Sequence, residues 1–217
     1  MKTAHFAQKE NLTTILLAAV IVVTAFNVLQ TDKLSAYTVN TASFAGPEGS
    51  VGADITPKGV PVIYGEELGV SYDDVSVSTP QKADATIGKI GLLDVNIELT
   101  GDDLQRYIAI TSRISCEYCC GAESIIFSNG DAACGCAHSY AMRGLAKYLI
   151  TEHGDEYTND QILEELGKWK TLFFPDQITV KADVLQSMGV ELNYVNLASN
   201  KYRDVEKGAT GGMVGGC

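Results

Sequence analysis

The chain has 217 residues, 46% of them hydrophobic, which is enough for one domain with a hydrophobic core and appended segments. A chain of this size does not need disulfides to fold, so its six cysteines point to chemistry instead of the cross-linking of a very small domain. The formal net charge of −11 and the scattered basic residues oppose binding to phosphate backbones, so no nucleic-acid partner is expected.

The first predicted element is a hydrophobic segment, residues 12–29, which contains no charged side chain. As a helix with a rise of about 1.5 Å per residue it would be about 27 Å long, close to the thickness of a bilayer's hydrocarbon core. A cleaved signal peptide is the alternative, but the apolar run is long, and a cleavage site after Ala36 would put Leu34 at position −3. We therefore expect an uncleaved membrane anchor.

The charges beside this segment predict its orientation. Lys2 and Lys9 precede it, so the positive-inside rule places the N-terminus in the cytoplasm and the remainder of the protein outside the cytoplasm. After the anchor the chain is rich in Ser, Thr, Gly, Ala and Pro, a composition typical of an extended stalk. The predicted parts are a cytoplasmic tip and anchor at 1–34, a stalk at 35–58, a Cys/His helical domain at 59–190 and a flexible tail at 191–217.

Weak secondary-structure signals follow the stalk. Residues 60–64 and 72–78 each have the pattern of a short edge strand, because proline and flanking Asp and Gly residues limit their pairing. Residues 82–93 favour a helix broken by two glycines, and residues 94–99 alternate like a strand.

Helix signals in the distal half are clearer. Thr158 and Gln161 form a capping box, and the helix that they open must end before Pro175. Its apolar stripe, with the stripes of its neighbours, predicts a small helical bundle around Trp169 and Phe173. Helices are predicted over about 101–114, 137–152, 158–174 and 176–188.

The most informative feature is a concentration of soft ligands. Five of the six cysteines and one of the three histidines fall within 23 residues. Between the two cysteine groups, residues 124–128 precede Asn129-Gly130, the dipeptide favoured in two-residue hairpin turns. We expect a β-hairpin that brings the two groups together. The candidate metal ligands are Cys116, Cys119, Cys120, Cys134, Cys136 and His138.

A Cys-x-x-Cys loop, a hairpin and a helix with ligands in its first turn form the arrangement of a treble-clef zinc site. Cys134 and His138 would share a face if that stretch were helical. Both Zn²⁺ and Cu(I) accept thiolate and imidazole ligands. Because the candidates exceed the four ligands of a closed zinc site, the surplus indicates a spare thiol, a second metal or redox chemistry.

Several candidates also have purely structural explanations. Cys116 could be a buried apolar residue at the end of its helix, and His138 could cap or pack the start of the next. Cys119 and Cys120 cannot both point at one centre from a regular strand, since successive side chains diverge. Cys217, the last residue, is either a ligand on a flexible tether or a lone thiol.

The runs ISCEYCCGA at 114–122, ACGCAHSYAMRGLAKYL at 133–149 and ILEELGKWKTLFFP at 162–175 resemble a family of uncharacterised membrane-anchored proteins from archaea and small-genome bacteria. The cysteine layout is also similar to that of the PCYCGC-motif lipoproteins, which implies metal handling. It is similar, too, to the thiol-oxidoreductase subunits of cytochrome c maturation, which implies disulfide exchange. The sequence departs from the first in its CEYCC motif and from the second in its additional cysteine group.

The predicted fold is α+β: an N-terminal transmembrane helix, a stalk, and a mainly helical domain bearing a treble-clef-like Cys/His hairpin. The expected function is that of a membrane-anchored, extracytoplasmic metal-binding protein, with the membrane and a metal ion, Zn²⁺ or Cu(I), as partners. Zinc would be structural, whereas copper would be handled as cargo. Two alternatives remain open: a thiol–disulfide redox protein that uses Cys116 and Cys119, and a disulfide-stabilised surface module.

Overall fold

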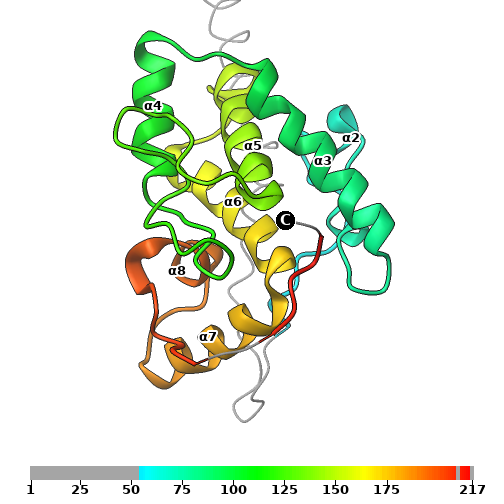
Figure 1. Ribbon diagram of the computed structural model, residues 1–217, viewed down its shortest axis with the longest axis vertical. Coiled ribbons are helices and arrows are strands. Elements are labelled where there is room, and N and C mark those ends of the chain that lie inside the picture. Colours follow the sequence, from blue (N-terminus) through cyan, green and yellow to red (C-terminus); the bar gives the residue numbers. More distant parts are fainter. Residues whose placement is uncertain (1–53, 209–210, 216–217) are drawn as a thin grey trace, which may run out of the picture. The chain divides into compact units, whose positions relative to one another are not determined.

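The structure, a computed structural model, describes residues 54–208 and 211–215 (Figure 1). The regular elements of these residues are helices that follow one another along the chain. Their bounds are α2 Gly65–Leu68, η1 Tyr72–Asp74, α3 Pro80–Asn96, α4 Gly101–Thr111, α5 Ala137–His153, α6 Asn159–Phe173, α7 Pro175–Ser187, α8 Tyr194–Ala198 and η2 Asn200–Tyr202.

Helix α5 is the centre of the arrangement, and it packs against α3, α4 and α6 (Figure 1). Its closest neighbour is α3, and glycines permit the approach. A Cβ atom added to Gly144 would lie 2.4 Å from the carbonyl oxygen of Ile90, and one added to Gly91 would lie 3.3 Å from Cβ of Tyr140. The backbones of α3 and α5 can therefore come closer than larger residues at these positions would allow.

The helix boundaries follow the local signals in the sequence. Thr158 and Gln161 form the predicted capping box at the start of α6. Pro175 occupies the first position of α7, where its missing N–H costs no hydrogen bond. Trp169 and Phe173 are buried in the core. The four predicted helices of the distal half are thus confirmed as α4, α5, α6 and α7.

A buried polar network fastens the segment before α3 to α6. The hydroxyls of Tyr64 and Tyr72 both donate hydrogen bonds to Oε2 of Glu165, and the indole of Trp169 donates one to Tyr64 (2.8 Å). Lys168 pairs with the other carboxylate oxygen at 2.7 Å. All of these side chains are buried, so each polar group has a partner away from water.

The predicted α+β class is wrong for the described residues, which contain no strand and only isolated bridges, among them Ile126 with Ala132. The chain does reverse at Gly130, whose φ is +93°. The pairing beside this turn is short: the N–H of Phe127 donates to the carbonyl of Asp131 and that of Ala133 to the carbonyl of Ile125, which Arg143 also contacts. A treble-clef hairpin is therefore absent, and the two cysteine groups meet through loops.

The expected strands upstream are also wrong. Within the first, residues 62–64 form a turn that leads into α2, and within the second, residues 72–74 form the 3-10 helix η1. Helix α3 continues through its glycines to Asn96, over part of the predicted strand 94–99. The reason is tertiary, because Asp94 makes ion pairs with Arg143 and Lys147 of α5 that hold this end of α3 in place.

The single-pass membrane topology predicted from the sequence is not supported. In the described part of the chain no helix is long and apolar enough to cross a bilayer. The predicted span at 12–29, and with it the whole of 1–34, lies outside the described residues.

The predicted stalk and tail are described only in part. Ile55, near the end of the predicted stalk, is buried. The segment expected as a tail contains α8 and η2, and α8 packs against α6. Val214 is buried as well, and its N–H donates a hydrogen bond to the carbonyl of Phe173 (2.9 Å). Cys217 lies outside the described residues.

Candidate metal centre

Three buried cysteines, Cys116, Cys134 and Cys136, bring their sulfur atoms together. The three Sγ atoms all lie within 4.8 Å of one another. The Sγ–Sγ distance is 3.2 Å between Cys116 and Cys136 and 3.5 Å between Cys134 and Cys136. These distances exceed a disulfide bond length of about 2.05 Å, so the three sulfurs are not joined to one another by disulfides. The group has the donors and the spacing to hold a metal ion.

The start of α5 presents two groups to this cluster. Cys136 is the N-cap of α5, and its sulfur accepts a hydrogen bond from the backbone N–H of Ser139 (3.4 Å). The Ser139 hydroxyl lies 2.7 Å from Sγ of Cys116. The first turn of a helix favours negative charge, so this position suits a thiolate. Cys134 precedes the helix, and so the expected sharing of a helix face between Cys134 and His138 does not occur.

The thiols have unequal acidities. A hydrogen bond from Cys116 lowers the pKa of Cys136 well below its usual range, against the effect of burial and with further contributions from His138 and Ser139. The same contact and burial raise the pKa of Cys116, and burial raises that of Cys134. Of the three buried thiols, Cys136 is therefore the one whose thiolate form its surroundings favour.

Arg143 holds the backbone of the second cysteine group in place. Its Nη1 donates hydrogen bonds to the carbonyl oxygens of Cys134 (2.8 Å) and Ile125 (3.3 Å). Its Nε donates to Asp94 at 2.7 Å, and the guanidinium stacks on the ring of Tyr140. Because Arg143 is fully buried, the position of Cys134 is coupled to the packing of α3 on α5.

Cys120 lies beside this cluster and at the surface. Its thiol interacts with that of Cys134, which contributes to the raised pKa of Cys134. Unlike Cys116, Cys134 and Cys136, Cys120 is exposed, and Cys119 is half-buried. Of the three buried thiols, Cys120 thus interacts with that of Cys134. It does not include Cys119 among the sulfur atoms that converge.

His138 is completely buried behind Cys136. Its Nε2 lies 2.8 Å from the carbonyl oxygen of Val214, and its ring packs between those of Phe173 and Phe174. A carbonyl only accepts hydrogen bonds, so this contact keeps a proton on Nε2. Its side chain also interacts with Cys136 and helps to lower the pKa of that thiol. His138 thus supports Cys136, a candidate metal ligand. That His138 itself binds a metal ion remains a prediction.

The loop after Cys116 begins with an unusual turn. Glu117 has φ of +54°, and the N–H of Tyr118 donates a hydrogen bond to the carbonyl of Cys116, as in a γ-turn. Such a conformation is costly for a residue with a side chain. The surrounding structure must therefore hold it in place.

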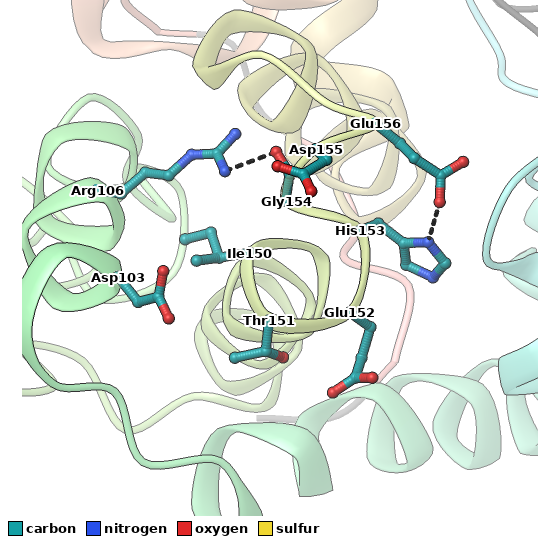
Figure 2. A pocket seen from close by; sticks show the side chains of 9 residues that line it. All are labelled: Asp103, Arg106, Ile150, Thr151, Glu152, His153, Gly154, Asp155 and Glu156. Carbon is teal, nitrogen blue, oxygen red and sulfur yellow. Dashed lines mark hydrogen bonds and ion pairs between the residues drawn. The ribbon is translucent and has the colours of Figure 1, made fainter. Parts of the chain in front are cut away.

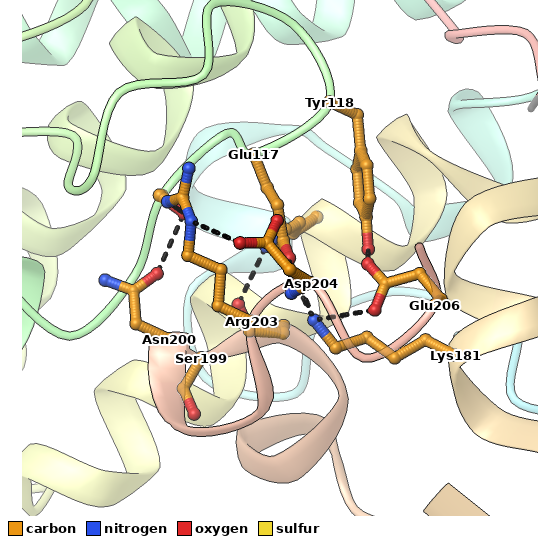
Figure 3. A network of polar contacts seen from close by, with 12 residues as sticks. Glu117, Tyr118, Lys181, Ser199, Asn200, Arg203, Asp204 and Glu206 are labelled. Carbon is orange, nitrogen blue, oxygen red and sulfur yellow. Dashed lines mark hydrogen bonds and ion pairs between the residues drawn. The ribbon is translucent and has the colours of Figure 1, made fainter. Parts of the chain in front are cut away.

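Two buried lysines provide that support, and Figure 3 shows one of them, Lys181, beside Glu117 and Glu206. Nζ of Lys170 lies 2.9 Å and that of Lys181 3.2 Å from the Glu117 carboxylate, and the N–H of Asp204 donates a third contact (2.9 Å). Burial would raise the pKa of Glu117, but the two lysines outweigh burial and lower it to about 2. Lys181 also faces Glu206 at 3.6 Å. The turn is therefore fixed by a buried, charge-balanced cluster.

Arg203 holds the far end of the same loop. Its guanidinium donates hydrogen bonds to the carbonyl oxygens of Gly121 (3.0 Å) and Ala122 (2.8 Å) and to the hydroxyl of Ser115 (2.8 Å). The loop that carries Cys119 and Cys120 is thus fixed on both sides of its tip.

A surface pocket of about 420 Å³ lies at the other end of α5 (Figure 2). Its two cationic or titratable nitrogen-bearing side chains, Arg106 and His153, are already paired. Arg106 donates to the carbonyl oxygen of Gly154 (2.8 Å), and His153 is held between Glu156 (2.9 Å) and Glu67 (3.1 Å). Because α5 is about 25 Å long, this pocket is remote from the thiols.

The residues that support the cluster were not predicted from the sequence, namely Ser139, Arg143, Lys170, Lys181 and Arg203. One signal was present for Lys170, which follows Leu163 by seven residues and Leu166 by four and so falls on the apolar face of α6. A lysine on such a face needs a buried counter-charge.

No family model matches the chain, and neither a curated protein nor a solved structure does so.

Proposed function

We propose that this protein binds one thiophilic transition-metal ion through the thiolates of Cys116, Cys134 and Cys136, with Cys120 as the fourth ligand. The observation that carries the proposal is the convergence of three buried sulfur atoms within 4.8 Å. Few physical uses other than metal binding or disulfide exchange account for buried thiols at this spacing. The resemblance to the PCYCGC-motif lipoproteins, which implies metal handling, agrees with it.

The donor set favours Zn²⁺. Structural zinc sites are tetrahedral and have four ligands, and the three buried sulfurs together with Cys120 supply that number. Four thiolates around Zn²⁺ leave a net charge of −2, and the N-terminus of α5 offers partial positive charge at Cys136. Cu(I) is the second candidate, because the three buried thiolates alone suit a soft monovalent ion.

The test is a metal count on the full chain purified without oxygen. We expect about one metal ion per chain, as for a single four-coordinate site, with all thiols free in the unfolded protein. Replacing Cys136 by Ser should abolish stoichiometric metal. Its matched control, C119S, removes a nearby thiol outside the converging group and should retain the metal. A wild-type protein that binds no Zn²⁺ or Cu(I) would refute the proposal.

The C120S variant separates the two metals. Loss of a fourth ligand should weaken Zn²⁺ binding by more than ~10-fold, since zinc loses one of its four protein bonds. Cu(I) retained by the three buried thiolates should be affected less. Competition with a chromogenic chelator for each metal measures both affinities.

A further inference from the structure

Residues 211–215, here called the terminal segment, lie against four helices without forming a regular element of their own (Figure 1, red). The residues that the segment meets come from α3, α5, α6 and α7. They are Ile87, His138, Phe173, Asp176 and Gln177, and together they are called the peptide site below.

The hydrogen bonds between the terminal segment and this site use main-chain groups of the segment. Val214 donates its N–H to the carbonyl of Phe173 (2.9 Å), and its own carbonyl accepts from Nε2 of His138 (2.8 Å). The carbonyl of Gly211 accepts from Nε2 of Gln177 (3.0 Å). Contacts of this kind hold the backbone of a bound peptide, while pockets for its side chains provide selectivity.

Selectivity comes from one buried side chain and two glycines. Val214 is buried, whereas its neighbour Met213 is exposed. A Cβ atom added to Gly211 would lie 2.4 Å from Cβ of Asp176. Gly215 has φ of +86°, a conformation that side chains disfavour, and an added Cβ there would lie 2.3 Å from Ile87. The site therefore accepts a small aliphatic residue with glycine three positions before it and one after it.

The terminal segment leaves one group of the site unused. Gln177 is buried, and although its Nε2 donates to Gly211, its Oε1 has no hydrogen-bond partner among the described residues. A buried acceptor without a partner is uncommon in folded proteins. A peptide with a hydrogen-bond donor at this point would thus make one more bond to the site than the protein's own segment makes.

We propose that the peptide site binds a segment of a partner protein with the pattern Gly-x-x-Val-Gly and with a donor that faces Gln177. Residues 211–215 occupy the site in cis and compete with the partner, so they are autoinhibitory. A tethered ligand of this kind acts at an effective concentration that can be roughly millimolar, and the partner must displace it. This inference needs no metal and stands apart from the proposed function.

The experiment uses the full chain and, as probe, a fluorescein-labelled synthetic peptide with the sequence of residues 209–216. In G211A/G215A the added methyl groups should expel the terminal segment, so the probe should bind at least ~10-fold more tightly than to the wild type in an anisotropy titration. The matched control is G212A, which adds a methyl group in open space and should bind like the wild type.

Two changes test how the freed site recognises the probe. A probe with Asp in place of Val214 should bind at least ~10-fold more weakly, because a carboxylate cannot enter the apolar position. Adding Q177M to G211A/G215A should weaken binding of the original probe by ~3- to 10-fold, since a hydrogen bond to the peptide backbone is lost.

A chemical footprint reports whether the terminal segment has left the site. His138 is completely buried and should resist diethyl pyrocarbonate in the wild type. In G211A/G215A its modification should be at least ~10-fold faster, because the site is open more often, and excess probe should restore protection. His153, at the other end of α5, is the internal control and should react equally in both proteins.

Four results would overturn the inference. They are no probe binding to folded G211A/G215A, equal binding of the Asp-containing probe, protection of His138 in that variant, or a wild-type dimer that the probe dissociates, which would assign the site to a second copy of the chain. If circular dichroism shows that G211A/G215A is unfolded, V214A, which only shortens the buried side chain, replaces it with the same expectations. Loss of the fold in both variants would make the terminal segment a part of the core and would also refute the proposal.

Discussion

The Lys170 ammonium, wholly enclosed by protein, lies 2.9 Å from the carboxylate of Glu117, the residue that follows the first cysteine of the cluster. Burial lowers the pKa of Lys170, and the negative charge of Glu117 opposes that effect. The same lysine donates a hydrogen bond to the carbonyl of Ala198, at the end of α8 (2.9 Å). One side chain of α6 therefore connects the cysteine loop with the C-terminal part of the protein.

Replacing Glu117 by Gln should destabilise the protein by about 3–5 kcal/mol, because it leaves two buried lysines without their main counter-charge. Denaturant unfolding of the metal-free protein measures the loss. E123Q, which changes an exposed glutamate of the same loop region, is the control and should cost less than about 0.5 kcal/mol. Equal stabilities for the two variants would show that the lysine cluster does not hold the loop.

Acid should weaken the fold through Glu117. Its folded pKa, about 2, lies below the ordinary value of 4.5, so its stabilising contribution is complete above pH 4.5 and is lost as the pH falls toward 2. Unfolding free energies measured from pH 6 down to about pH 2.5 should show this decline. In E117Q the decline should be shallower, and an unchanged slope would contradict the assignment.

Arg143 should matter for both stability and metal retention. R143M removes the donors to the carbonyls of Cys134 and Ile125 and leaves the buried Asp94 with Lys147 alone. We expect a loss of about 3–5 kcal/mol in unfolding free energy and weaker metal binding, since supporting contacts typically contribute 10- to 100-fold in affinity. In R143K, which keeps the charge opposite Asp94, part of the stability should return but not the affinity.

The His138→Ala variant should show whether His138 only supports the cysteine cluster or itself binds the metal ion. The loss of a buried ring between Phe173 and Phe174 should cost about 2–4 kcal/mol of stability through the cavity it leaves. Metal stoichiometry should stay at the wild-type value, because the proposed ligands are all thiolates. If elemental analysis of folded H138A showed no metal, His138 would belong among the ligands after all.

Two glycines give a matched test of how α3 and α5 pack. A Cβ at Gly144 would meet the Ile90 carbonyl at 2.4 Å, so G144A should be destabilising by roughly 1–3 kcal/mol. Gly88 has open space around it and lies within α3, so G88A should instead stabilise the protein by about 0.5–1 kcal/mol. Thermal unfolding of both variants should show shifts of opposite sign.

The sequence predicts the helices well where local chemistry sets their ends. Thr158 caps the start of α6, and Pro175 restricts the residue before it and so sets the end of that helix. Both signals act within a few residues along the chain. Helix α3 was harder to predict, because Gly88 and Gly91 are helix breakers by composition. In the structure Gly91 is a packing residue, and its role depends on a helix almost fifty residues further along the chain.

Prediction of the cysteine cluster from the sequence was limited in the same way. The spacing of Cys116, Cys134 and Cys136 was enough to predict that the two groups meet, yet the expected β-hairpin was the wrong means. Arg143, a side chain that no local pattern connects with this turn, helps to hold the loops in place through the carbonyls of Ile125 and Cys134. Likewise, the buried charges around Glu117 come from distant helices, so their effect on the loop could not be read from the cysteine motif.

Because the supporting groups all follow the cysteines in the chain, the order of synthesis bears on how the centre matures. When Cys136 is joined to the growing chain, Lys170, Lys181 and Arg203 have not yet been made. The cysteines are thus synthesised before the residues that enclose them, so the centre can close only after the later helices have been added.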